Sequence, residues 1–121
     1  MKDDTIKIDF SKKALTANLN AVGFEEGNSF VVYIASLELS AYGDNFDEAN
    51  EMLKISLDEF SKEIFKMPMN RALGILKDLG WKSNKIFKKR MVNLSETTFD
   101  DIKKEFNLPE NTPVREFPIA V

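Results

Sequence analysis

Cysteine and histidine are both absent from this sequence of 121 residues. Without cysteine the chain has no disulfide, no thiolate nucleophile and no zinc–thiolate site, which is compatible with a reducing compartment. Without histidine it lacks the commonest general base near neutral pH and the commonest transition-metal ligand. Catalysis would therefore depend mainly on carboxylate acid/base chemistry or on magnesium-assisted phosphoryl chemistry.

Long apolar runs and a basic leader are missing as well. The sequence has no stretch of about 18 apolar residues, the length that a membrane span needs. Asp3 and Asp4 stand near the start, where a signal peptide would need a basic stretch followed by an apolar one. We therefore expect neither export nor membrane insertion, and a cytoplasmic location. The five glycines form neither a P-loop nor a dinucleotide-binding fingerprint.

Apolar and charged residues are both plentiful. Hydrophobic residues make up 43% of the sequence and charged residues 31%, with ten Phe among them. This composition is typical of a folded globular chain, and the length suits one domain over residues 1–121. The charge is uneven, since residues 66–90 hold eight Lys and Arg against one Asp, whereas residues 1–65 hold six against thirteen acidic residues. The basic block can contact an anionic partner or pair with its acidic flanks, and we favour internal pairing.

Alternating apolar and polar residues predict a series of antiparallel strands. The predicted strands are Thr5–Phe10, Leu15–Ala21, Phe30–Ala35 and Leu37–Ala41, with a hairpin loop at Gly23–Ser29. The third strand is almost continuously apolar and rich in β-branched residues, so we expect it to be central and buried on both faces. A β-meander is the economical topology for consecutive strands of this kind.

A long amphipathic helix is predicted after these strands. Asn45 can cap it, and Glu48 stands three residues later, where an acidic group favours the positive end of the helix dipole. Apolar residues then recur at helical spacing, which predicts a helix lying across the sheet. This apolar stripe comprises Phe46, Ala49, Leu53, Leu57, Phe60 and Ile64. The helix should end at Met67-Pro68-Met69, because proline lacks a backbone donor and disfavours helical geometry at the residue before it.

Weaker patterns predict further elements in the C-terminal half. These elements are a helix over Asn70–Leu79 stopped by Gly80, a strand within Lys85–Leu94, a helix from a cap in residues 95–98 to Phe106, and an edge strand within Pro113–Val121. The helix boundaries rest on capping residues and on the glycine stop. The predicted fold class is therefore α+β: an antiparallel β-meander with a long amphipathic helix packed on one face, plus additional C-terminal helices and a strand.

The junction before the long helix reads Gly43-Asp44-Asn45-Phe46-Asp47-Glu48-Ala49. Together with the preceding strands it resembles the HicB-like antitoxin domain, which commonly shows Gly-Asp-(Thr/Ser)-x-(Glu/Asp)-Glu-Ala here. The matching turn motif is Gly43, Asp44, Asn45, Glu48 and Ala49. The resemblance covers roughly residues 15–65 and leaves residues 66–121 as an extension. Asn45 replaces the usual Thr or Ser, and residues 36–40 replace a Pro-x-Leu-Pro-Gly-Cys run.

The resemblance carries its own expectations about fold and function. It implies a small meander with a helix packed on it, often described as a partial RNase H fold, that binds and neutralises a partner RNA-cleaving toxin. Members usually assemble as oligomers and add a DNA-binding segment. For this chain the resemblance implies a protein-interaction module that self-associates and sequesters a small protein partner.

A basic segment near the middle of the chain is the second candidate surface. Its members are Trp81, Lys82, Lys85, Phe87, Lys88, Lys89 and Arg90. Cations contact phosphates and exposed rings can stack on unpaired bases, so nucleic-acid binding by the Lys82–Arg90 patch is the alternative function. The competing interpretation, which we favour, places Trp81 and Phe87 in the core and leaves the lysines solvated or internally paired.

Four carboxylates gather at the predicted helix start: Asp44, Asp47, Glu48 and Glu51. Such a cluster could hold magnesium. RNase H-type metal sites, however, draw their ligands from separate strands and helices, and complementarity to the helix dipole explains this cluster more simply. We therefore expect no metal, no cofactor and no catalytic residue, and a chain that binds a partner rather than catalysing a reaction.

Overall fold

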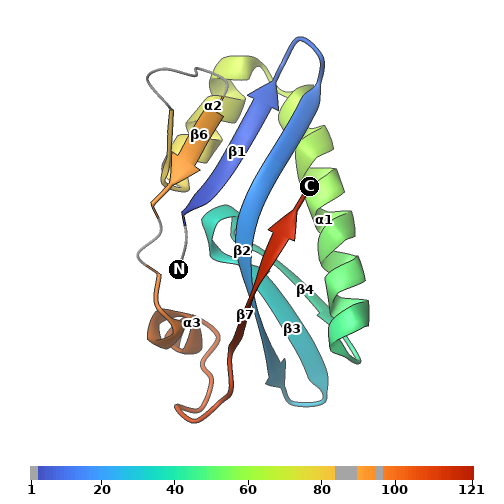
Figure 1. The fold of residues 1–121 in the computed structure, drawn as a ribbon, viewed down its shortest axis with the longest axis vertical. Helices are drawn as coiled ribbons and strands as arrows, with labels where there is room; N and C mark the ends of the chain where they lie inside the picture. The colour runs from blue at the N-terminus through green and yellow to red at the C-terminus, as the bar shows by residue number, and fades with distance from the viewer. Residues whose placement is uncertain (1–2, 84–89, 95–96) are drawn as a thin grey trace.

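The computed structural model describes residues 3–83, 90–94 and 97–121 (Figure 1). The strands are β1 (Asp4–Asp9), β2 (Ala14–Glu26), β3 (Ser29–Ile34), β4 (Leu39–Gly43), β5 (Trp81–Ser83), β6 (Arg90–Asn93) and β7 (Arg115–Ala120). They form one sheet in the order β4-β3-β2-β1-β6-β5, and β7 pairs with β2 beside this path. The predicted α+β fold, an antiparallel sheet with a long helix packed against it, is confirmed.

The long strand β2 organises the sheet. Its residues 14–18 pair with β1, residues 18–23 with β7 and residues 22–26 with β3. β2 therefore takes the central place that the sequence assigned to the strand from Phe30, which lies between β2 and β4. The alternation of apolar and polar residues does not reveal that this strand of thirteen residues pairs with three other strands.

The hairpin between β2 and β3 is tighter than predicted. β2 continues to Glu26, and the chain turns at Gly27, whose φ of 59° suits glycine. Gly23 lies inside the strand, where a Cβ atom would come within 2.9 Å of the Phe30 ring. Gly23 thus marks a close approach between neighbouring strands rather than the turn that its sequence context suggested.

The main hydrophobic core lies between one face of the sheet and two helices, α1 (Phe46–Lys66) and α2 (Met69–Asp78). Figure 1 shows α1 along one side of the sheet and α2 behind β1 and β6. The predicted helix stripe is confirmed. Its fully buried members are Ala49, Leu53, Leu57 and Ile64. After α2 the chain turns at Gly80, where φ is 99°.

The opposite face of the sheet is covered over only part of its area. There α3 (Phe99–Glu105) packs through Ile102 onto a second apolar cluster. The sheet residues of this cluster are Val22, Phe24, Val31 and Tyr33. Consequently β3 is buried on both faces, as the sequence predicts. Over β1, β6 and the first half of β2, none of the described helices lies on this face (Figure 1), which we call the open face.

The remaining predicted elements are present with shifted ends. The predicted second helix is α2, the strand sought within residues 85–94 is β6, and the edge strand is β7. Thr98, inside the predicted range of caps, is the N-cap of α3 and forms a capping box with Asp101. β5 was not predicted, because a strand of three residues is too short to show alternating apolar and polar residues. Among the helices that the structure describes, none has the length and apolar character to cross a membrane.

Candidate functional site

The Gly43–Ala49 motif forms a tight strand-to-helix junction. The Asn45 side chain caps α1 by accepting from the Glu48 amide at 2.9 Å. A Cβ atom at Gly43 would lie 2.9 Å from the Glu48 Cβ and would press on the backbone of the fully buried Ala49. Asp44 is exposed beside them. Gly43, Asn45 and Ala49 therefore have structural reasons for their identity.

Trp81 is a core residue and not part of a surface. It is 1% exposed, and its Nε1 donates to the Ser36 carbonyl oxygen at 2.9 Å. A buried indole usually needs such a partner. This removes Trp81 from the candidate surface. The structure does not describe the candidate residues Lys85, Phe87, Lys88 and Lys89.

A buried polar cluster fixes the sheet beside Trp81. The Asp4 carboxylate accepts hydrogen bonds from the backbone amide of Asn20 at 2.9 Å, from the side-chain Nδ2 of Asn20 at 2.6 Å and from the Ser36 hydroxyl. These bonds join the start of β1 to the middle of β2 and to a short 3₁₀ helix, Ala35–Leu37. A buried carboxylate is tolerated when its oxygens are hydrogen-bonded in this way. The cluster holds the strands that carry the open face.

The two described cations of the predicted basic patch lie on the open face. Lys82 stands opposite Val92, which stands opposite Thr5 on β1. Arg90 stands opposite Lys7, also on β1. Residues directly opposite each other in antiparallel strands share a face, so β1 contributes a third cation beside the two from the patch. No pattern in the sequence indicates that β6 pairs with β1, so Lys7 was not predicted as part of this surface.

The outer face of α1 is a second exposed surface. Met52 and Ile55 are 45% and 50% exposed and stand three residues apart, which places them on the same side of the helix. The acidic residues Glu48, Glu51 and Glu59 are exposed around them. We call these five residues the α1 patch. The α1 patch was not predicted from the sequence; its available signal was two apolar residues that lie outside the buried stripe.

Among the residues that the structure describes, the ion pairs of α1 involve no member of the α1 patch. Lys62 lies 2.9 Å from Asp58, and Lys66 lies 3.2 Å from Glu63. Both pairs follow one another near the C-terminal end of α1, beyond most of the α1 patch, and all four side chains are more than half exposed. Exposed pairs of this kind contribute little to stability. The second pair joins Lys66, from the basic residues 66–90, to Glu63, from the acidic residues 1–65. It is a contact of the kind that internal pairing of the two segments predicts.

The carboxylates at the start of α1 do not converge. Asp44, Asp47, Glu48 and Glu51 are all exposed around the first turns of the helix. In the described part of the chain no three carboxylates lie close enough together to hold a metal ion. Acidic side chains near the N-terminus of a helix are stabilised by the positive end of the helix dipole, which explains why these carboxylates gather there.

Comparison with models of known protein families, with curated proteins and with solved structures finds no match to this chain.

Proposed function

We propose that this chain is a cytoplasmic protein-interaction module, resembling a HicB-like antitoxin, that binds and sequesters a small basic protein on the α1 patch. Its role is binding rather than catalysis. The observation that carries the proposal is the exposure of Met52 and Ile55 on a helix that also exposes Glu48, Glu51 and Glu59. Specific interfaces commonly combine an apolar centre with a polar rim.

The charge of α1 indicates the kind of partner. The helix holds six Asp and Glu against three Lys, and two of those lysines are paired within the helix. An acidic helix face attracts a basic protein and speeds its association. The length of α1, 21 residues, offers room for an extended contact. A small basic partner also agrees with the toxin that the resemblance implies.

The test is affinity capture from the native cell with the full chain as bait. Wild-type protein should retain a small basic protein at a constant ratio. The double substitution Met52→Ala and Ile55→Ala should weaken that binding by about 30-fold, or about 2 kcal/mol, because it removes the apolar centre. The matched control is Leu94→Ala, since Leu94 is 56% exposed and lies outside α1.

Two results would refute the proposal. If the double variant retained the partner as strongly as the wild type does, the interface would lie outside the α1 patch. Equal loss of binding in the Leu94→Ala control would show a general effect on the fold. A charge test adds a second measurement: Glu48→Lys with Glu51→Lys should slow association most at low salt.

A further inference from the structure

Among the residues that the structure describes, three strands pair on one side only. β4 pairs with β3, β5 with β6 and β7 with β2. The outer edge of such a strand offers unpaired amide and carbonyl groups to another chain, and folded proteins usually protect it with proline, with lysine or by keeping the strand very short. The three edges differ in this protection.

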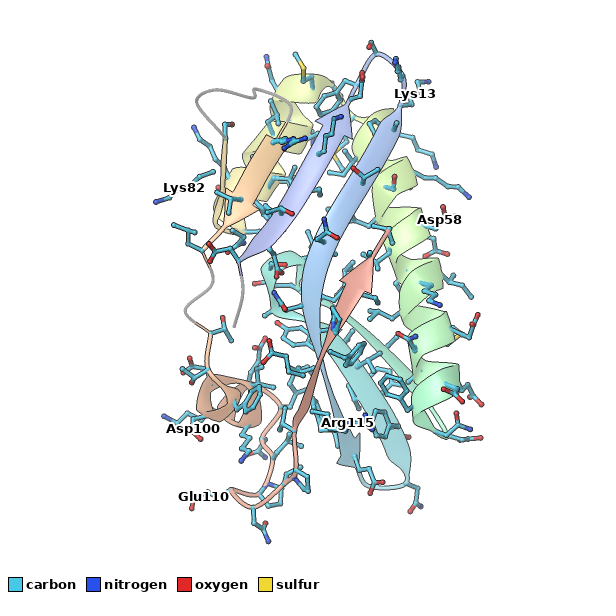
Figure 2. All side chains as sticks on the ribbon, in the orientation of Figure 1. Lys13, Asp58, Lys82, Asp100, Glu110 and Arg115 are labelled. Atoms are coloured by element: carbon cyan, nitrogen blue, oxygen red, sulfur yellow. The ribbon has the colours of Figure 1, made fainter. Side chains whose placement is uncertain are left out.

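The edges of β5 and β7 are protected. β5 has only three residues and carries Lys82, which Figure 2 shows at one edge of the sheet. Just beyond β7, Val121 exchanges backbone hydrogen bonds with Ala17, and the pairing with β2 continues without a break to Arg115. Since bonded residues alternate along an antiparallel ladder, Pro118 turns its backbone nitrogen to the outer edge, where it offers no donor.

The outer edge of β4 has no such protection, because its five residues include neither proline nor lysine. At residues 22–23, β2 pairs with β7 and β3 at once, so its odd-numbered residues bond to β7 and its even-numbered residues to β3. Carried through the registers of β3 and β4, this alternation makes Ser40 and Tyr42 direct their backbone groups away from β3. The Tyr42 side chain is 55% exposed. β4 can therefore pair with an extended chain.

The surroundings of β4 are acidic. Residues 38–53 hold five Asp and Glu and no Lys or Arg. Glu38 and Asp44 stand exposed at the two ends of the strand. Glu48 of the α1 patch adjoins it, since a Cβ atom at Gly43 would lie 2.9 Å from the Glu48 Cβ atom. The edge and the α1 patch thus lie next to each other (Figure 1), and their charge favours a basic chain.

A second copy of this chain fits the edge poorly. In an antiparallel pairing of two β4 strands centred on Ala41, Glu38 of each copy would stand opposite Asp44 of the other, because both lie equally far from Ala41. Like charges directly opposite each other are destabilising. A segment that carries lysine or arginine at these places would instead be attracted to both carboxylates.

We propose that the small basic partner adds an extended segment bearing lysine or arginine to the outer edge of β4. Ser40 and Tyr42 exchange backbone hydrogen bonds with this segment, and Glu38 and Asp44 attract its cations. Strand addition of this kind draws affinity from main-chain hydrogen bonds and specificity from alternate side chains. The inference rests on the proposed function, because it concerns how the same partner is held.

The probe is a short fluorescein-labelled peptide of alternating lysine and valine, whose binding to the full chain is measured by fluorescence anisotropy. Two further peptides carry N-methyl groups on all lysine amides or on all valine amides. Because a strand presents alternate amides to one edge, one methylated peptide should bind about tenfold more weakly and the other nearly as well as the parent. Glutamate in place of every lysine should also weaken binding about tenfold.

Two proline substitutions test the edge from the side of the protein. Tyr42→Pro removes a backbone donor that faces away from β3 and should weaken peptide binding about tenfold. Ala120→Pro is the matched control, because Ala120 is exposed and its amide faces the outer edge of β7. It should leave peptide binding unchanged. Melting temperatures establish that both variants are folded, and the methylated peptides decide the question if a proline variant unfolds.

Several results would overturn the inference. They are absence of binding by the parent peptide, equal binding by the two methylated peptides, equal binding by the lysine and glutamate peptides, and an equal loss in Ala120→Pro and Tyr42→Pro. A dimer of the chain that Tyr42→Pro dissociates would also overturn it, because a second copy would then occupy the edge.

The capture experiment separates this inference from the proposed function. If Tyr42→Pro retains the basic protein as strongly as the wild type does, strand addition is refuted and the proposed function stands. If the wild-type chain captures no basic protein, the proposed function is refuted, and the peptide measurements still decide whether β4 accepts a basic strand.

Discussion

Gly43 ends β4 where the first turn of α1 lies against its backbone. A Cβ atom there would meet Glu48 and the Ala49 backbone, and backbone cannot move aside as a flexible side chain can. We predict that Gly43→Ala lowers the free energy of unfolding by about 2 to 3 kcal/mol. Urea denaturation measures the change.

Gly74 provides the matched control for this substitution. It lies within α2, and an added Cβ atom would meet nothing within 4 Å. Gly74→Ala should therefore raise the free energy of unfolding by about 0.5 to 1 kcal/mol, the usual gain for a helical glycine. If both substitutions had the same effect, the junction would not be the tight contact described above.

At the scale of elements, α3 is held to the sheet by aromatic contacts. The Phe106 ring lies 5.0 Å from that of Phe24 and 4.9 Å from that of Tyr33, both edge to face. We predict that Phe106→Ala costs about 2 to 3 kcal/mol and speeds amide exchange in α3 far more than in α1. Phe99→Ala is the control, because Phe99 is 38% exposed at the start of the same helix. Equal effects of the two substitutions would contradict this account of how α3 docks.

A hydrogen bond between β3 and α3 makes stability depend on alkaline pH. The Tyr33 hydroxyl donates to the Glu105 carboxylate at 3.1 Å. Burial, followed by this carboxylate, raises the pKa of Tyr33 well above its ordinary value of 10. The folded state therefore holds the phenol proton more tightly than the unfolded chain. This stabilisation is fully present below pH 10 and is lost as the pH rises above it.

The substitution Tyr33→Phe isolates that pH dependence. The variant should lose about 1 kcal/mol at neutral pH with the hydrogen bond. Above pH 10 the wild type should lose up to about 1.4 kcal/mol more per pH unit than the variant. Denaturation curves between pH 8 and pH 11 measure the difference, and parallel declines of the two proteins would exclude Tyr33 as its cause.

Element boundaries were predictable where a local signal exists. The Asn45 cap and the apolar stripe located α1, and alternation located β1 and β7. Gly23 was wrongly predicted to lie in a loop, because a glycine required by a close ring contact looks like a turn residue in the sequence. β5 gave no signal, since its three residues combine a buried Trp81 with two exposed positions.

At the scale of the whole molecule, the candidate surfaces depend on pairings that local patterns do not contain. Lys7 and Arg90 are 83 positions apart and become neighbours only because β6 pairs with β1. Trp81 lies in the core, as the favoured interpretation of the basic segment predicts, because Ser36 and the main core enclose it. The α1 patch is recognisable from the sequence, because Met52 and Ile55 are apolar residues that lie outside the buried stripe of the helix.

The arrangement of the molecule places an acidic helix and a basic sheet face on opposite sides of one core. α1 packs on the face that holds the main core, and the cations project from the other face. A partner protein bound to the α1 patch would therefore leave the residues of the open face uncovered. Charge separation of this kind also orients the approach of charged partners.

Photo-crosslinking in the native cell tests the central claim, that α1 receives a protein partner, most directly. A photoreactive residue replaces Ile55 in one variant and Glu110 in another, because Glu110 is exposed and far from α1 in Figure 2. We predict that position 55 crosslinks to one small basic protein and that position 110 does not. Crosslinking of the same protein at both positions, or of none at position 55, would contradict the claim.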